Sequence, residues 1–283
     1  MPAEPPVVSP YSLREAFELL AEQPHRPLAG GTDLLVQLTG ELGPVPERVI
    51  DLWQVDELRG IAIRGEYLEL GALTTYTDIR RSPICGEHLP ALVEAAATIG
   101  AAQIQHRGSI GGNVMNASPA GDMLPVLLAL DASLVVGGQS GEREIPATEF
   151  WPAYRRTAAR PDELLVRIRI MLGTDREQRF RKVGTRRAQA ISKVVVAAAW
   201  RGTDTWREVR IALGSVAPTP IRVREAETAL EGRPRDVASI DAAVIALGAA
   251  IKPIDDVRST AAYRREAARR VVRRLLADSL ETL

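Results

Sequence analysis

The sequence has a single cysteine, Cys85, among its 283 residues. One thiol cannot form a disulfide within the chain, and it cannot supply the several thiolates that ligate an iron–sulfur cluster. Histidine is scarce as well: His25, His88 and His106 lie far apart and show no spacing typical of a metal site. We therefore predict that the chain holds no metal centre of its own.

An excess of charge and a long apolar run are also absent. Lys+Arg and Asp+Glu number 36 each, which argues against binding of nucleic acid or of an anionic membrane surface. The best apolar stretch, residues 123–136, is interrupted by Pro125 and Asp131 and is shorter than the roughly 20 residues of a membrane span. The first residues lack the basic and apolar regions of a signal peptide. We therefore expect a cytoplasmic protein with no membrane span.

Three patterns of hydrophobic and polar residues follow one another along the chain. The first fifty or so residues alternate between helical and strand patterns, which is typical of a small α/β unit. Their predicted elements are helix 12–20, strand 26–29, helix 33–38 and strand 48–52. The middle region mixes both patterns, and a hairpin signal at residues 65–66 separates two segments that alternate with period two.

In the last region, strands are followed by helices. Its predicted elements are strands 180–184, 194–200 and 208–213 and helices 222–230, 239–247 and 260–280. This order favours a sheet with helices packed on one face. We therefore predict an α+β fold with a first domain over 1–175, divided into subdomains at about 1–57 and 58–175, and a C-terminal domain over 176–283.

Two glycine-rich turns are the strongest candidates for a binding site. The first, residues 28–34, reads L-A-G-G-T-D-L and lies between a predicted strand and a predicted helix. Glycine lets the backbone approach a ligand closely, and the start of a helix offers unpaired N–H groups to an anion. These features suit a phosphate, although they would equally suit a tight turn that binds nothing.

The second turn, residues 107–113, reads R-G-S-I-G-G-N and follows a predicted helix over 90–102. We expect this segment to be a loop that combines bare backbone with short polar side chains, and such a mixture can hydrogen-bond a large polar ligand. Its polar side chains are Ser109, Asn113, Asn116 and Ser118. Neither turn matches the Rossmann or P-loop patterns, but the two together could enclose a pyrophosphate from both sides.

In this order the two turns resemble those of the flavoproteins of the molybdenum hydroxylases. That family includes the FAD domain of xanthine dehydrogenase and the medium subunit of carbon monoxide dehydrogenase. The strongest match is R-G-S-I-G-G-N-V-M-N-A-S-P-A-G-D over 107–122, and shorter ones are A-G-G-T-D-L from Ala29, G-A-L-T-T from Gly71 and F-W-P-A-Y-R-R-T from Phe150. The resemblance covers essentially the whole chain and implies a two-subdomain, PCMH-type FAD-binding fold.

The resemblance also implies which residues contact FAD. The residues that it places on the pyrophosphate are Pro27, Leu28, Ala29, Gly30, Gly31, Thr32, Asp33 and Leu34 on one side and Ser109, Ile110, Gly111, Gly112 and Asn113 on the other. Asp122 matches an acidic residue that contacts the cofactor, and Ile99 and Leu165 match apolar contacts. Lys182 matches a lysine near the flavin, and Ile191 matches the residue that faces the isoalloxazine ring. No catalytic side chain is implied, because the flavin carries the redox chemistry.

The residues alone leave other interpretations open for several of these positions. Lys182 could be a solvated charge on a strand edge, and Ile99 and Ile191 could be ordinary core residues. In the helix at 260–280, valines and leucines lie on one face and arginines on the other. That helix could contact another subunit, or it could pack on its own sheet with a solvated arginine face.

The resemblance implies one piece of a larger enzyme. Electrons would originate at a molybdenum-cofactor large subunit and pass through iron–sulfur clusters on a small subunit. They would then leave through FAD to an external acceptor. The alternatives are a stand-alone flavin oxidoreductase of the same fold and a scaffold that has lost its flavin. The sequence leaves the organic substrate and the acceptor open; Gln189 and Ala190 stand where animal xanthine dehydrogenases have acidic residues, which does not favour NAD.

Overall fold

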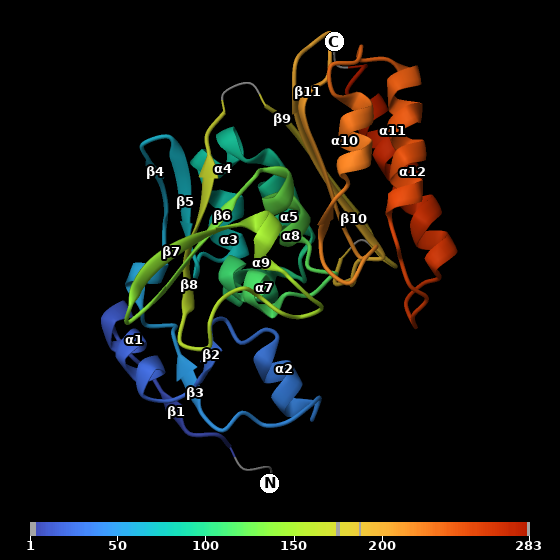
Figure 1. Ribbon diagram of the computed structural model, residues 1–283. Helices are drawn as coiled ribbons and strands as arrows, with labels where there is room; N and C mark the ends of the chain where they lie inside the picture. The colour runs from blue at the N-terminus through green and yellow to red at the C-terminus, as the bar shows by residue number, and fades with distance from the viewer. Residues whose placement is uncertain (1–3, 174–175, 187, 282–283) are drawn as a thin grey trace.

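The computed structural model describes residues 4–173, 176–186 and 188–281, and these residues form three β-sheets (Figure 1). The first sheet is parallel, with the order β1–β3–β2. Its strands are β1 (Val7–Val8), β2 (Arg26–Leu28) and β3 (Val49–Asp51), and the helices beside it are α1 (Leu13–Glu22) and α2 (Leu34–Thr39). The helix–strand alternation predicted for this region is confirmed, and Ser12 caps α1 by accepting a hydrogen bond from the backbone of Glu15.

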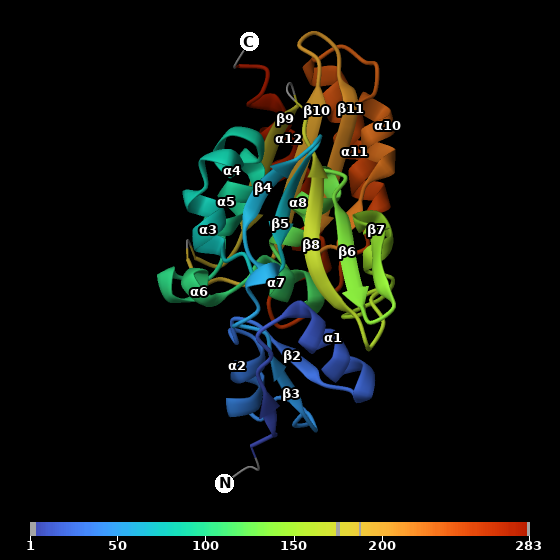
Figure 2. The same ribbon diagram turned by 90° about the vertical axis from the view of Figure 1, so that its left-hand side faces the viewer.

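The second sheet is antiparallel, with the order β4–β5–β8–β6–β7. Its strands are β4 (Ile61–Arg64), β5 (Tyr67–Gly71), β6 (Ser133–Gly138), β7 (Gly141–Pro146) and β8 (Leu164–Met171). The helices of the same region are α3 (Tyr76–Arg81), α4 (Pro83–His88), α5 (Pro90–Thr98), α6 (Ala102–Arg107), α7 (Ile110–Asn116), α8 (Met123–Ala129) and α9 (Ala147–Phe150), and a 3₁₀ turn, η1 (Asp56–Leu58), precedes β4. Figure 2 shows one face of this sheet toward the viewer with α3, α4 and α5 beside and behind it.

The third sheet is antiparallel, with the order β12–β11–β10–β9, and three helices cover one of its faces (Figure 1). The elements are β9 (Glu177–Val183), β10 (Val194–Arg201), β11 (Arg207–Gly214), β12 (Ile221–Arg222), α10 (Arg224–Leu230), α11 (Val237–Ala250) and α12 (Ala261–Ala277). The predicted strands-then-helices arrangement is confirmed. The domain boundaries themselves stay a prediction.

Helix α8 lies between the second and third sheets (Figure 1), and all seven of its residues are buried. Strand β10 is likewise buried on both faces. Val195 and Ala197 belong to the main core, while Val196 and Trp200 belong to the core between the third sheet and its helices. A strand that is buried on both faces needs apolar side chains at successive positions, and β10 has them.

Helix α12 packs on its own sheet. Val272, Leu275 and Leu276 are buried there, while arginines of the other face pair with carboxylates of the same chain, for example Arg273 with Asp241 at 2.7 Å. This arrangement matches the packing interpretation of the helix. Within the described residues, no helix combines the length and the apolar character that crossing a membrane requires.

The structure corrects the prediction around the second glycine turn. The predicted helix 90–102 ends at Thr98, because Gly100 adopts a φ of +54°, and a separate helix α6 follows. The segment after Gly108 is not a loop but the first turns of α7. Ser109 caps this helix by accepting a hydrogen bond from the backbone N–H of Gly112 at 3.1 Å, which offsets the low helix propensity of the glycines.

The two glycine turns touch each other at Gly30. A Cβ atom on Gly30 would lie 1.7 Å from the carbonyl oxygen of Arg107, so no larger residue fits without a backbone shift. The Arg107 guanidinium in turn lies 3.7 Å from the centre of the Trp53 ring, which follows β3. Backbone contact and cation–π stacking thus hold the parallel sheet against the start of α7.

We expect Gly30→Ala to lower the free energy of unfolding by more than about 2 kcal/mol, because the clash is with backbone atoms rather than with a movable side chain. Chemical denaturation of the apoprotein measures the effect. Gly86→Ala is the matched control: a Cβ atom on Gly86, in α4, would have no neighbour within 4 Å, so the substitution should be neutral or stabilising. Equal free energies of unfolding for Gly30→Ala and Gly86→Ala would contradict the close contact between Gly30 and the backbone of Arg107.

Candidate functional site

Two cavities meet at the glycine turns. The smaller, of about 160 Å³, lies between the β2–α2 turn, the start of α7 and the start of β8 at Leu165. The larger, of about 820 Å³, extends from the α7–α8 connection to β9, the β9–β10 connection and the loop before α12. The residues that line both cavities are Thr32, Asp33, Tyr76, Asn113 and Asn116. We call this shared part the passage.

The residues predicted to bind FAD converge on these cavities, although they come from distant parts of the chain. The smaller cavity has Pro27, Leu28, Ala29, Gly30, Gly31, Thr32, Asp33, Leu34, Ser109, Gly111, Gly112, Asn113 and Leu165, and the larger one adds Ile99, Asp122, Lys182 and Ile191. Ile110 is the exception. Its side chain is fully buried in the main core and lines neither cavity, and its backbone N–H donates to the carbonyl of Thr74.

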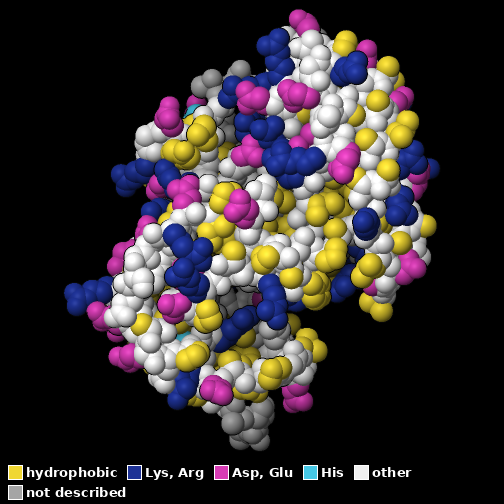
Figure 3. Space-filling view, in the orientation of Figure 1, with side chains coloured by type: hydrophobic (Ala, Val, Ile, Leu, Met, Phe, Trp, Pro, Cys, Tyr) yellow, Lys and Arg dark blue, Asp and Glu magenta, His cyan; other side chains and the backbone are white. Residues whose placement is uncertain are grey.

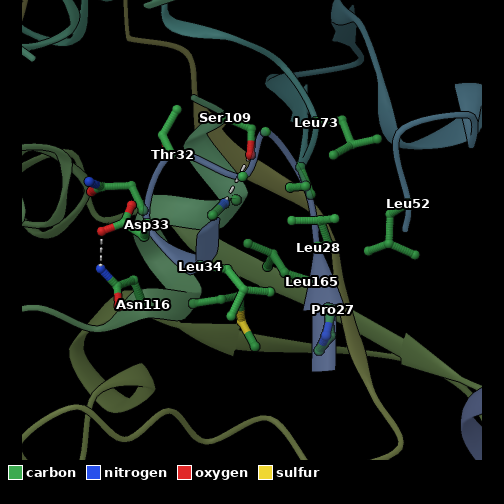
Figure 4. Close-up of a pocket in the computed structure, with 18 of the residues that line it drawn as sticks. Pro27, Leu28, Thr32, Asp33, Leu34, Leu52, Leu73, Ser109, Asn116 and Leu165 are labelled. Carbon is green, nitrogen blue, oxygen red and sulfur yellow. Dashed lines mark hydrogen bonds between the residues drawn. The ribbon is translucent and has the colours of Figure 1, made fainter. Parts of the chain in front are cut away.

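The smaller cavity combines an apolar wall with an open space beside a glycine of α7. Leu28, Leu34 and Leu165 surround it in Figure 4, together with Leu52 and Leu73. On the opposite side, a Cβ atom on Gly112 would meet only the hydroxyl of Ser109, at 3.1 Å. The absence of a side chain at Gly112 therefore leaves room beside the first turn of α7.

The passage is polar. Asn116 donates from Nδ2 to Oδ1 of Asp33 at 2.9 Å (Figure 4), and Oδ1 of Asn113 is buried without a hydrogen-bond partner. Tyr76 is only 4% exposed, and burial together with the nearby carboxylates of Asp33 and Asp122 raises the pKa of its hydroxyl. Burial likewise raises the pKa of Asp33, while the positive charge of Arg155 acts in the opposite direction.

An ion pair lies at the other end of the larger cavity. Lys182 of β9 donates from Nζ to Oδ2 of Asp122 at 2.5 Å and to the carbonyl oxygen of Thr98 at 3.1 Å. The side chains of the pair are 9% and 8% exposed, so the interpretation of Lys182 as a solvated surface charge is wrong. Burial raises the pKa of Asp122 to about 6, although Lys182 opposes this shift, and Oδ1 of Asp122 has no partner.

The two isoleucines differ in their surroundings. Ile191 is 57% exposed on the wall of the larger cavity, so the interpretation of it as a core residue is also wrong. Ile99 is half-buried: it packs against the main core and lines the larger cavity as well.

Sequence reasoning missed several residues that line these cavities. Tyr76 directly follows the G-A-L-T-T match but was not singled out. Asn116 was named among the polar side chains of the second turn, although not among the FAD contacts. Leu52 comes from a segment far from either turn and carried no local signal, whereas Arg155 lies inside the F-W-P-A-Y-R-R-T match but was not singled out there. They reach the site only through the packing of β3 and of the segment before β8.

Two known protein families match this chain, one after the other along the sequence. The FAD binding domain in molybdopterin dehydrogenase matches residues 3–170, and the CO dehydrogenase flavoprotein C-terminal domain matches residues 179–279. The chain belongs to the FAD-binding subunits of the molybdenum hydroxylases. FAD is accordingly its cofactor, as the resemblance of the motifs implied.

Alignments with individual relatives extend over almost the whole length of this flavoprotein. It is 34% identical over 275 residues to the carbon monoxide dehydrogenase medium chain of Hydrogenophaga pseudoflava, covering 95% of this chain and 94% of that one. It is 30% identical to the nicotinate dehydrogenase FAD-subunit of Eubacterium barkeri, covering 97% and 96%. A solved structure of the H. pseudoflava carbon monoxide dehydrogenase superposes with a TM-score of 0.94 at 32% identity, covering 98% and 97%.

The residues present in the flavoprotein fit FAD. Oδ1 of Asn113 and Oδ1 of Asp122 are buried acceptors without partners, and the hydroxyl and imide groups of FAD could donate to them. Beside Gly112 the structure leaves space that a Cβ atom would fill. The leucine-rich wall of the smaller cavity suits an aromatic ring system. The cavities thus offer polar acceptors, an open space beside α7 and an apolar wall, which together suit a dinucleotide.

We expect Lys182→Met to raise the pKa of Asp122 above its value of about 6, because the burial of the carboxyl persists while the opposing positive charge is lost. Carbon-13 NMR of the carboxyl group in the apoprotein measures the titration. Lys193→Met is the control, since Lys193 lies against the ring of Tyr263 and outside both cavities. A wild-type Asp122 that titrates near the ordinary aspartate value would contradict the burial of the pair.

Proposed function

We propose that this chain is the FAD-binding, electron-transferring subunit of a cytoplasmic molybdenum hydroxylase, in which electrons from the iron–sulfur clusters of a small subunit reach an external acceptor. The observation that carries the proposal is the pair of cavities joined at two glycine turns, with unpartnered acceptors in the passage and beside Lys182. The relatives named above are the medium chain or FAD-subunit of dehydrogenases, which supports the same role.

The two cavities suggest how the chain orients its cofactor. The smaller cavity is apolar and takes one flat ring, so we assign to it the adenine end. The passage, with Gly30, Gly31, Gly111 and Gly112 close by, would hold the pyrophosphate. Lys182, Asp122 and Ile191 would then face the flavin end in the larger cavity.

Bound FAD would supply reversible two-electron chemistry, and the protein's part is to hold and tune it. In this proposal Ile191 covers the ring with an apolar surface and the ammonium of Lys182 places positive charge near it, while Asp122 and Thr98 keep that ammonium in position. The buried pair thereby sets the local electrostatic field without a side chain that must act as an acid or base.

The other centres of the complex would lie on partner chains. With Cys85 as its single cysteine, this chain cannot ligate an iron–sulfur cluster. We therefore propose a hetero-oligomer with an iron–sulfur small subunit and a molybdenum-cofactor large subunit. The organic substrate would bind to the large subunit, so this chain does not determine it.

We expect Gly112→Val to give folded protein with little bound flavin, because the new side chain occupies the space beside the first turn of α7. The flavin absorption bands of the purified chain measure the content, and circular dichroism measures the fold. Gly86→Val in α4 is the matched control and should keep its flavin. Normal FAD content in Gly112→Val would refute the assignment of this turn.

We also expect the isolated chain to bind FAD without oxidising carbon monoxide, purines or N-heterocycles, because the oxygen-transfer centre lies on another subunit. Substrate-dependent dye reduction tests this, with the chain alone and with the iron–sulfur and molybdenum subunits added. Turnover by the chain alone at a rate comparable with the complex would favour a stand-alone flavin oxidoreductase instead. A purified chain without flavin bands that also fails to take up added FAD would favour a scaffold that has lost its flavin.

A further inference from the structure

The F-W-P-A-Y-R-R-T segment has a well-anchored base. Phe150 and Trp151 are buried and pack edge to face at 5.5 Å. The indole N–H of Trp151 donates to the carbonyl of Val114 in α7 at 3.1 Å, and the backbone N–H of Ala158 donates to the carbonyl of Phe150 at 2.9 Å. The segment is therefore a closed loop fastened to the same helix that carries the second glycine turn.

The apex of this loop presents Arg155 to the passage. Arg155 adopts a φ of +52°, an uncommon conformation for a residue other than glycine, and such residues concentrate at functional sites. Its Nη1 donates to Oδ1 of Asn116 at 3.2 Å, and Asn116 donates in turn to Oδ1 of Asp33 at 2.9 Å. A chain of three side chains thus crosses from the loop to the first glycine turn.

Charge balance in the larger cavity singles out the same residue. Its other cations are already paired with carboxylates: Lys182 with Asp122, and both Arg258 and Arg264 with Asp256. Arg155 hydrogen-bonds Asn116 and Tyr154, and it has no ion pair with a carboxylate among the residues that the structure describes. A diphosphate placed in the passage would lie beside Asp33, and this like charge needs a nearby cation to offset it.

We propose that the guanidinium of Arg155, aligned by Asn116, binds the diphosphate of the cofactor and offsets the charge of Asp33. This inference rests on the proposed FAD site and adds a positively charged third wall to the two glycine turns. Figure 3 shows a hollow above the N-terminal region that is bordered by Lys and Arg side chains, as a site for an anionic group would be. A planar guanidinium suits phosphate oxygens because it can donate two parallel hydrogen bonds.

Titration of the flavin-free full-length chain with FAD, followed by flavin fluorescence, tests the proposal. We expect Arg155→Met to weaken FAD binding by about 10- to 100-fold, the effect of losing a charge-assisted hydrogen bond. ADP, which carries the diphosphate but no flavin, should compete less well with FAD for this variant than for the wild type. Arg155→Lys should recover part of the affinity, because lysine keeps the positive charge but cannot donate the two parallel hydrogen bonds of a guanidinium.

Arg156→Met is the matched control. Arg156 is the adjacent arginine and lines neither cavity, so its loss changes the net charge equally and should alter FAD affinity by less than about twofold. The unfolding midpoints of both apoprotein variants should match the wild type, which separates cofactor binding from folding.

Three results would overturn the assignment of Arg155. The first is a wild-type affinity in Arg155→Met, and the second is an equal loss of affinity in Arg156→Met. The third is full recovery of affinity in the Asp33→Asn/Arg155→Met double variant, since Arg155 would then only neutralise Asp33. A wild-type chain that binds no FAD would instead contradict the proposed function itself, so the two failures are distinguishable.

Discussion

The contact between the backbone of Gly30 and the carbonyl of Arg107 determines where the cofactor site can form. These atoms belong to connections of two different sheets, and the space between them admits no side chain at residue 30. Because the contact is between backbone groups, it places the two glycine turns at a separation that no rotamer change can alter. The passage, the two cavities and the chain from Asp33 through Asn116 to Arg155 all depend on this placement.

Much of this site was predictable because its residues lie in short, contiguous motifs. The residues flanking Gly30 and most of those flanking Gly112 line the smaller cavity. The patterns of hydrophobic and polar residues predicted the right element types for the N-terminal and C-terminal regions. Lys182 and Ile191 also reach the larger cavity, although the residues alone equally allowed a surface charge and a core position.

The failures have physical causes. The glycine content of residues 108–113 favoured a loop, but a cap by Ser109 and tertiary packing outweigh the cost of glycine in a helix. Ile110 faces the core because residues two positions apart on a helix point in nearly opposite directions, and Gly112 lines the cavity. Arg155 lies inside a quoted match and Tyr76 directly after one, but neither match gave them a role, since only the folded chain brings the segment before β8 and the start of α3 to the passage.

The burial of α8 and β10 has a consequence for how the two family domains are joined. The two family domains meet between them, yet α8 is covered by the third sheet and one face of β10 belongs to the main core. Separating the halves would expose an apolar helix and one face of an apolar strand to water, which is strongly unfavourable. The boundary that sequence families recognise therefore crosses a buried apolar interface. Elements on the two sides of the larger cavity are thus joined through buried apolar contacts around α8 and β10.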